Sequence, residues 1–463
     1  MSSLSSRTRT LASFLARGGA QLAADLFDRT PGRRAHDGPA RAEAVATRLD
    51  LPAAPVDVAI VGAGIVGTCI ALTLAERGLR VALFDKGQVA GEASSRAFGW
   101  ITDLFEEPAK LPLAVRSKRL WAAMNERIGA DTGFRPDDTM FLCRTPAELD
   151  AATAWSAQAR QAGAATRVID RTALQARLGG AAEGWRGAML LDGEGSIDAR
   201  HATAPIARRA QALGVHIAAP CAVRALITDG RRVTGVHTEH GPCHAGNVVL
   251  AGGVWSSRLA TAHGLVLRTV QLFLSNQALR LRPHTGPQRS LFTPQVDWWL
   301  GDDGLCRIGH PMATVPVTGA LLRQAPRYLG LIAAMGDDVK LKLRWGGGLP
   351  LRPDRVSPFE RCRVLSPEPD RRGLDEVYAR FVDQFPDCAG AAVVDRWAGA
   401  VALTPDGLPC LGAAPGLQGL HVATGFTAVL TQGPAAAESL VQAMLGEATT
   451  VDLRPFDPAR FTL

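Results

Sequence analysis

The pattern of apolar positions between residues 58 and 85 predicts a strand, a helix and a second strand in succession. Residues 58–61 form a short uninterrupted apolar run, which is typical of a buried parallel strand. Apolar residues then recur at helical spacing over residues 65–77, and Gly78 can end that helix. The run of residues 80–84, apolar after Arg80, predicts the second strand, which ends at Asp85. This order favours a dinucleotide site at the end of the first strand.

Three glycines lie in the turn that joins the first strand to the helix. Gly62 permits the tight turn, Gly64 lets the backbone approach a pyrophosphate, and Gly67 lets the helix pack closely on the strand. The phosphates would then lie at the positive end of the helix. The three glycines alone are weak evidence in a chain with 48 glycines, but the surrounding elements make the prediction specific. The residues expected at the phosphates are Gly62, Ala63, Gly64, Ile65, Val66 and Gly67.

Two segments after the second strand extend this predicted site. Asp85 is placed to accept hydrogen bonds from a ribose 2′-hydroxyl, which favours an adenosine without a 2′-phosphate over NADP. Lys86 follows it directly. Residues 91–100 form a turn rich in small residues, and its backbone amides are suited to bind a second polar part of the cofactor.

Further along the chain, the pattern predicts one more helix and several strands. Residues 196–198 can cap a helix over residues 199–213, which Gly214 ends. Strands are predicted at residues 215–217, 223–227 and 233–238, the last with the alternation of a hairpin. Residues 247–250 indicate a buried strand that runs into a glycine turn. That turn is either an ordinary strand end or the edge on which a cofactor lies.

Composition excludes several classes of protein. A chain of 463 residues with 47% hydrophobic content can bury the cores of two domains. No stretch approaches 18 uninterrupted apolar residues, so no membrane-spanning helix is expected. The net charge of +7 would allow an acidic partner, but the basic residues are scattered, which disfavours a nucleic-acid groove. The eight cysteines form no CxxC pair, so we expect no metal site, and reduced thiols in a cytoplasmic protein.

Residues 1–55 differ from the rest of the chain. They hold eight arginines and no lysine, and a proline-rich joint at residues 51–55 precedes the first strand. We expect a flexible or loosely docked extension. The alternatives are a contact with a partner or with a membrane surface, for which residues 11–26 could form an amphipathic helix, and a targeting peptide.

The order of these segments, together with motifs near the end of the chain, resembles the D-amino-acid oxidase family. The motifs are Trp397-Ala398-Gly399, residues 404–409, residues 423–426 and Arg460-Phe461, so the resemblance covers about residues 56–461. The family includes glycine and sarcosine oxidases and bacterial D-amino-acid dehydrogenases. The resemblance implies FAD instead of free NAD. It implies noncovalent FAD, because the family's attachment positions hold no cysteine or histidine here.

The resemblance also implies an α/β fold with two interleaved domains. A Rossmann-like FAD-binding domain would comprise residues 56–100, 190–265 and 395–463. Residues 101–189 and 266–394 would form a substrate domain on a large antiparallel sheet, and residues 1–55 the extension.

Carried over position by position, the family places several residues at FAD. The backbone of Val223 would meet the adenine, Ala251 and Gly252 would lie beside the pyrophosphate, and Asp406 and Gly425 would lie near the ribityl chain and the pyrimidine end of the flavin. Besides the glycine turn, the residues expected at FAD are Asp85, Lys86, Ser94, Ser95, Arg96, Val223, Ala251, Gly252, Trp255, Asp406 and Gly425.

The last turn departs from the family pattern. Family members usually carry more glycine after the position of Gly425, and Gln432 stands where sarcosine oxidases have a lysine. A neutral amide cannot supply a fixed positive charge, so an arginine would have to bind a substrate carboxylate. Trp298, Trp299 and His310 fall in the predicted substrate domain. We expect them to have a core or structural role and not to line the pocket. The candidate catalytic and carboxylate-binding residues are Gln432, Arg96, Arg268, Arg307 and Arg344.

These inferences lead to an FAD-dependent oxidoreductase acting on an amino acid or related amine. Bound FAD would accept a hydride from the carbon that bears the amine, and water would hydrolyse the imine. The electron acceptor would be oxygen, or a quinone or respiratory carrier. Two alternatives stay open: oxidation of the CH–OH group of a 2-hydroxy acid, and a flavin-bearing subunit without its own turnover.

Overall fold

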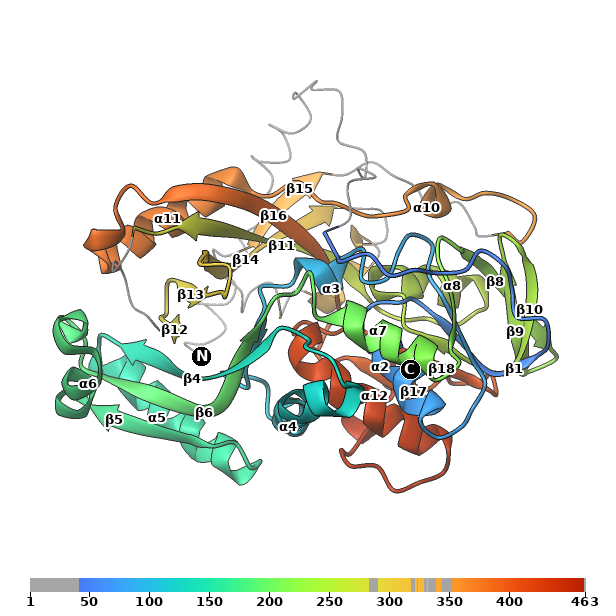
Figure 1. The fold of residues 1–463 in the computed structure, drawn as a ribbon, viewed down its shortest axis with the longest axis horizontal. Helices are drawn as coiled ribbons and strands as arrows, with labels where there is room; N and C mark the ends of the chain where they lie inside the picture. Colours follow the sequence, from blue (N-terminus) through green and yellow to red (C-terminus); the bar gives the residue numbers. More distant parts are fainter. Residues whose placement is uncertain are drawn as a thin grey trace.

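The computed structural model describes residues 41–282, 290–317, 321–322, 324–328, 331, 339–343 and 352–461. These residues form two large sheets, one of eight strands and one of ten. In Figure 1 the helices α2, α7 and α12 gather beside the first sheet, and the second sheet extends away from them. The segment 1–40, which includes the amphipathic helix expected at residues 11–26, lies outside the described residues.

The eight-stranded sheet has the order β17-β18-β10-β1-β2-β7, and the β8–β9 hairpin joins it at β10. Strands β7, β2, β1, β10 and β18 pair in parallel, whereas β17 is antiparallel to β18. Helix α2 is buried along its whole length, because α7 and α12 flank it over the sheet. The elements are β1 (Val56–Val61), α2 (Ile65–Ala75), β2 (Val81–Phe84), α7 (Thr203–Ala212), β7 (His216–Ala218), β8 (Val223–Asp229), β9 (Arg232–Thr238), β10 (Gly241–Leu250), β17 (Cys410–Ala413), β18 (Leu420–Thr424) and α12 (Val429–Met444).

The strand–helix–strand unit and the hairpin predicted from the sequence are confirmed. Gly78, which follows α2, has a φ of +79°, a conformation that glycine adopts at little cost. The helix expected to start directly after Asp198 begins instead at Thr203. Asp198 does not cap it, because its carboxylate accepts hydrogen bonds from the backbone and guanidinium of Arg200.

The ten-stranded sheet has the order β16-β11-β14-β13-β12-β4-β6-β3, with β15 beside β14 and β5 beside β6. Most neighbours pair antiparallel, as expected, but β12 with β4 and β14 with β15 pair in parallel. Its strands are β3 (Trp100–Ile101), β4 (Phe134–Cys143), β5 (Thr166–Asp170), β6 (Gly187–Ile197), β11 (Val270–Arg280), β12 (Leu291–Phe292), β13 (Asp297–Leu300), β14 (Cys306–Val317), β15 (Val339–Leu343) and β16 (Ala392–Leu403).

Helices α4 (Leu111–Ile128), α5 (Pro146–Gln161), α6 (Arg171–Leu178) and α11 (Arg371–Gln384) accompany these strands. The proposed domain boundaries at residues 190 and 395 fall inside β6 and β16, so both strands run through them. The division into domains stays a prediction. No helix among the described residues is long and apolar enough to cross a membrane.

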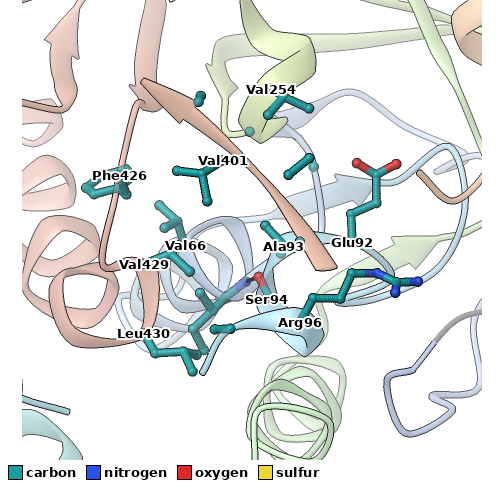
Figure 2. Close-up of a pocket in the computed structure, with 18 of the residues that line it drawn as sticks. Val66, Glu92, Ala93, Ser94, Arg96, Val254, Val401, Phe426, Val429 and Leu430 are labelled. Carbon is teal, nitrogen blue, oxygen red and sulfur yellow. Dashed lines mark hydrogen bonds between the residues drawn. The ribbon is translucent and has the colours of Figure 1, made fainter. Parts of the chain in front are cut away.

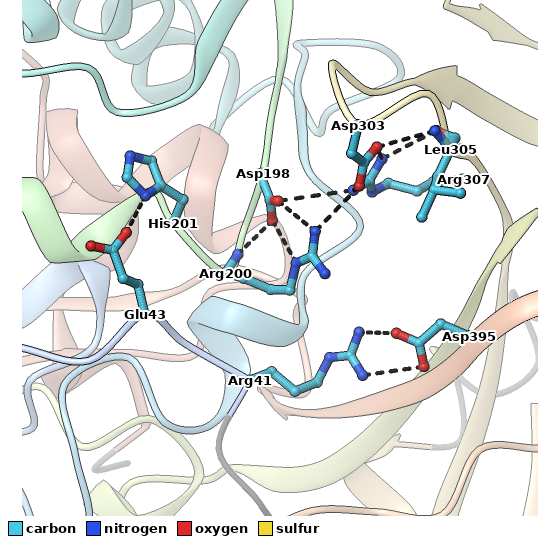
Figure 3. A network of polar contacts seen from close by, with 9 residues as sticks. All are labelled: Arg41, Glu43, Asp198, Arg200, His201, Asp303, Leu305, Arg307 and Asp395. Atoms are coloured by element: carbon cyan, nitrogen blue, oxygen red, sulfur yellow. Dashed lines mark hydrogen bonds and ion pairs between the residues drawn. The ribbon is translucent and has the colours of Figure 1, made fainter.

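Residues 41–50, the described part of the expected extension, make specific contacts with the rest of the chain. Glu43 pairs with His201, just before α7 (Figure 3), and with Arg208 on α7. The Thr47 hydroxyl donates to the Ala219 carbonyl at 2.5 Å, and the Arg48 amide donates to the Ile217 carbonyl at 2.9 Å. These contacts fix the segment beside the eight-stranded sheet, because its polar groups find partners at α7 and β7.

Candidate active site

A cavity of about 500 Å³ is lined from both sheets, a size usual for small-molecule sites. One wall comes from the carboxyl ends of β1, β2, β10 and β18 and the turns that follow them. The opposite wall comes from β11, β13, β14 and β16 of the ten-stranded sheet. Figure 2 shows side chains from both walls facing the same space.

The glycine turn after β1 forms one end of the cavity. Gly62 has a φ of +109°, and a Cβ there would lie 2.5 Å from the Ala251 carbonyl oxygen. A Cβ at Gly67 would lie 2.0 Å from the Gly62 carbonyl oxygen. A Cβ at Gly64 would closely approach only the Ser94 hydroxyl, at 3.0 Å. Gly62 and Gly67 are therefore needed for packing, whereas Gly64 leaves backbone open to the cavity.

Hydrogen bonds hold this turn against its neighbours. The Ile65 amide donates to the Ser94 hydroxyl at 3.0 Å. The Asp85 carboxylate accepts from the amides of Ala63 at 2.9 Å and Gly87 at 2.8 Å. Burial raises the pKa of Asp85, and the two amide bonds oppose that rise. The carboxylate lines the cavity, and each oxygen keeps accepting capacity for a ligand hydroxyl.

Next to Asp85, Glu92 connects two other residues of the cavity wall, a role that the sequence did not reveal. The Glu92 carboxylate accepts from Lys86 Nζ at 2.6 Å and from the Trp255 indole at 2.7 Å. All three residues line the cavity, and Val223 lies in the same lining. Arg363 joins them through a hydrogen bond to the Lys86 carbonyl at 2.9 Å. Glu92 and Arg363 were missed because Trp255 and Lys86, which they respectively contact, are distant from them in the sequence.

The turn after Glu92 forms the short helix α3 (Ala93–Arg96). Ser94 and Arg96 line the cavity, whereas Ser95 is buried behind it. Arg96 is only 3% exposed, and burial, reinforced by the nearby charge of Arg41, lowers its pKa to about 10. Figure 2 shows its guanidinium extending away from Ser94. A desolvated arginine at the cavity wall is suited to bind an anion.

The last turn, at Gly425, also lines the cavity, with Phe426 next to it (Figure 2). Gln432 is buried behind this turn, where its amide donates to Glu106 at 2.7 Å. Glu106 in turn pairs with Lys110 at 2.7 Å. Lys110 Nζ lies 3.5 Å from the Thr427 hydroxyl of the turn. Lys110 therefore supplies a cation near this turn, which sequence reasoning missed because it belongs to a distant segment.

The structure does not bring Arg307 or Arg268 to the cavity lining. Arg307 pairs with Asp303 at 2.7 Å, as Figure 3 shows, and its guanidinium lies 4.4 Å from the centre of the Trp299 ring. The Arg268 side chain donates to the Phe461 carbonyl at 3.0 Å. Arg344 lies outside the described residues.

Several residues expected at FAD also differ in their placement. Asp406 is paired with Arg460 at 2.8 Å and lies outside the cavity lining, because this ion pair holds its carboxylate. Ala63 and Gly67 are behind the lining, in the packed part of the turn. The residues of the predicted set that do line the cavity are Gly62, Gly64, Ile65, Val66, Asp85, Lys86, Ser94, Arg96, Val223, Ala251, Gly252, Trp255 and Gly425.

The wall from the ten-stranded sheet is aromatic, with a few polar groups. The Trp100 ring centre lies 3.5 Å from that of Phe292 and 4.7 Å from that of Phe98. Asn276, Asp297 and His310 also line this part. Trp298 is confirmed as a core residue, since its ring packs against Phe381 and Phe385. His310 instead faces the cavity.

A buried charge cluster lies next to this wall. Lys118 Nζ is 2.5 Å from Asp103 and 2.8 Å from Glu194, and all three side chains are nearly inaccessible. The backbone amide of Asp103 also donates to Glu194. Burial raises the pKa of Glu194 to about 7, although Lys118 opposes the rise.

The comparison with known families agrees with this geometry. The DAO family profile, described as FAD dependent oxidoreductase, matches residues 57–443. The chain belongs to this family. Family members are FAD-dependent, so the chain is an FAD-dependent oxidoreductase.

Individual relatives share the sequence and the fold. Glycine oxidase from Pseudomonas aeruginosa is 26% identical over 410 residues, which cover 87% of this chain and 98% of the relative. The structure of L-amino acid deaminase from Proteus myxofaciens, in complex with anthranilate, has a TM-score of 0.86 and 31% identity, covering 92% of this chain and 97% of that one. Glycine oxidase from Geobacillus kaustophilus has a TM-score of 0.68 and 26% identity, covering 88% and 99%.

The residues present fit FAD. Gly64 leaves backbone open where a side chain would otherwise fill the space, and the carboxylate of Asp85 is already oriented by two amides. The cavity then continues past α3 to the aromatic wall, so one end suits a dinucleotide and the other a substrate.

Proposed function

We propose that this protein oxidises the CH–NH bond of an amino acid or related amine. When bound, FAD supplies a hydride acceptor at flavin N5. The substrate then leaves as an imine, which water hydrolyses. Support comes from Arg96, a buried cation on the cavity wall, and from relatives named as glycine oxidase and L-amino acid deaminase.

In this proposal the two walls have separate tasks. The backbone of Gly62 and Gly64 and the Ser94 hydroxyl hold the pyrophosphate, and Asp85 holds the adenosine ribose. The binding is noncovalent. Acid or heat should therefore release the flavin into solution, and flavin that stays with the precipitated chain would contradict this part.

At the other end, Arg96 binds the substrate carboxylate through two parallel hydrogen bonds. The aromatic wall of Phe98, Trp100 and Phe292 packs against the rest of the substrate and excludes water from the reacting carbon. The anthranilate bound to the deaminase relative is a carboxylate attached to an aromatic ring, which agrees with this pairing of chemistries.

The test is anaerobic reduction of the flavin, followed by its absorbance, with D- and L-amino acids, glycine, sarcosine and 2-hydroxy acids. We expect an amino acid to bleach the flavin, and Arg96→Lys to raise KM about tenfold or more with FAD content unchanged, since a point charge cannot replace a two-pronged bond. Arg307→Lys is the matched control, because this buried arginine lies outside the cavity.

Other results of this experiment would assign a different role to Arg96 or a different reaction to the protein. Loss of FAD from Arg96→Lys would place this arginine at the cofactor. Bleaching by 2-hydroxy acids alone would show that the reaction is oxidation of a CH–OH group. No bleaching by any compound would favour a flavin-bearing subunit without turnover. Reoxidation by oxygen, with hydrogen peroxide as product, would separate an oxidase from a dehydrogenase that uses a quinone.

A further inference from the structure

One row of residues crosses the cavity face of the ten-stranded sheet. Phe292 of β12 lies opposite Asp297 of β13, which lies opposite Gly309 of β14, and Gly309 lies opposite Asn276 of β11. Residues that lie directly opposite each other in a sheet share a face. All four line the cavity, whereas Trp298, next along β13, packs in the core on the other face.

Asp297 stands out because its carboxyl group has no hydrogen bond and no ion pair with any residue that the structure describes. Other acids near this sheet are neutralised: Asp303 pairs with Arg307, and Asp395 pairs with Arg41. Burial raises the pKa of Asp297 well above its usual value, and no residue that the structure describes opposes that rise. Asp297 is half-buried and lines the cavity. A carboxyl group that is partly desolvated and has no partner among the described residues points to a ligand that satisfies it.

The surroundings of Asp297 indicate what kind of group that is. Gly309 has no side chain, which allows the Phe98 ring and the Asn276 amide oxygen to approach: a Cβ at Gly309 would lie 3.0 Å from each. On the other side, Phe292 packs against Trp100. A carboxylate between aromatic rings suits a cation, because the carboxylate and the ring faces both attract positive charge.

Asp297 and the first contact of α3 with this sheet lie on different strands. Asn276 lies opposite Trp397 of β16, whose indole donates to the Arg96 carbonyl. Asp297 is three strands from Trp397, a backbone separation of about 14 Å at the usual strand spacing. An amino acid with a long side chain that ends in a cation can reach across these strands to Asp297.

We propose that Asp297 determines substrate specificity by binding a positively charged group at the end of the substrate side chain, so that the cavity selects basic amino acids. This inference rests on the proposed function, with Arg96 at the substrate carboxylate. The terminal cation of the substrate then neutralises Asp297, while its carboxylate contacts Arg96 on the cavity wall.

The kinetic test compares lysine with norleucine, which has the same carbon chain but no terminal amine, in whichever enantiomer reduces the flavin. We expect the wild-type holoenzyme to have a kcat/KM for lysine about tenfold or more above that for norleucine. Asp297→Asn should lose that preference while it still oxidises norleucine, and Asp297→Glu should retain part of it. Asp302→Asn is the control, because this exposed acid pairs with Arg135 away from the cavity.

A binding test needs no turnover. The absorbance of the bound flavin is titrated with hexanoate and with 6-aminohexanoate, and only the wild type should bind the second compound about tenfold more tightly. Equal losses for lysine and norleucine in Asp297→Asn would overturn the proposal, because Asp297 would then contact the α-amino group common to both. Equal binding of the two titrants by the wild type would also overturn it. Asp297-dependent binding without flavin reduction by any amino acid would support the cation site and refute the proposed function.

Discussion

Gly64→Val tests the assignment of the glycine turn, because this position separates cofactor binding from folding. Gly64 precedes α2 with a φ of −70° and a ψ of 177°, an extended conformation that valine adopts without strain. The side chain would closely approach the protein only at the Ser94 hydroxyl. Its bulk would instead enter the cavity where the backbone is open.

The magnitudes for binding and for stability differ. If the branched side chain displaces the pyrophosphate from two charge-assisted hydrogen bonds, each worth about 1.5–3 kcal/mol, FAD binding should weaken at least about 100-fold. The fold should lose only about 1 kcal/mol, for the bond between Ile65 and Ser94. Gly67→Ala is the comparison variant. Its Cβ would lie 2.0 Å from a backbone oxygen, so this substitution should destabilise the fold itself.

The assay has two parts. Quenching of flavin fluorescence on addition of apoprotein gives the Kd for FAD, and thermal denaturation of the apoprotein gives the effect on the fold. We expect Gly64→Val to lose FAD while its apoprotein denaturation midpoint falls by only a small amount, and Gly64→Ala to be intermediate in Kd. Full flavin occupancy in purified Gly64→Val would refute the assignment of this turn to the pyrophosphate.

Three sites outside the glycine turn give further measurable outcomes. Asp85→Ala should raise the Kd for FAD about 10- to 100-fold in the same titration, through lost ribose hydrogen bonds, and an unchanged Kd would remove the ribose assignment. Folding raises the pKa of Glu194 from 4.5 to about 7, so its contribution to stability is present at low pH and lost as pH rises through 7. Urea denaturation should then show the wild type losing on the order of 3 kcal/mol relative to Glu194→Gln between these pH values, whereas parallel pH dependences would be incompatible with this shift. Deletion of residues 1–50 should lower the thermal denaturation midpoint relative to a chain that begins at residue 41, because the hydrogen bonds of Glu43 and Thr47 contribute about 1 kcal/mol each. Identical midpoints would show that these contacts contribute nothing.

The parts of the site that depend on local sequence were predictable. The turn with Gly62 and Gly64 and the acid Asp85 follow from spacing within one strand–helix–strand unit. The family resemblance added Val223 and Gly425, which also line the cavity although they are distant in sequence. For the local motif and for the residues added by the resemblance, the backbone conformation decides which residues line the cavity. Sequence patterns indicate backbone conformation well.

The remaining site residues depend on which distant side chains meet. Glu92 is a surface-type residue until Trp255 and Lys86 converge on it, and Lys110 reaches the last turn only because α4 packs against α12. Asp297 faces the cavity because of the register of β13 between its neighbours. No periodicity within one segment carries that information.

The cavity wall is formed by segments that lie far apart in the sequence. This limits when the protein can bind its cofactor. Gly62 precedes most of the chain, and the lining is completed only by the turn at Gly425 and the start of α12. At about 5–20 residues per second, synthesis of the intervening chain takes roughly 20–70 seconds. During that time the first strand and its glycine turn exist without the rest of their site. FAD must therefore enter a nearly finished protein, so cofactor supply and translation can be limiting at different times.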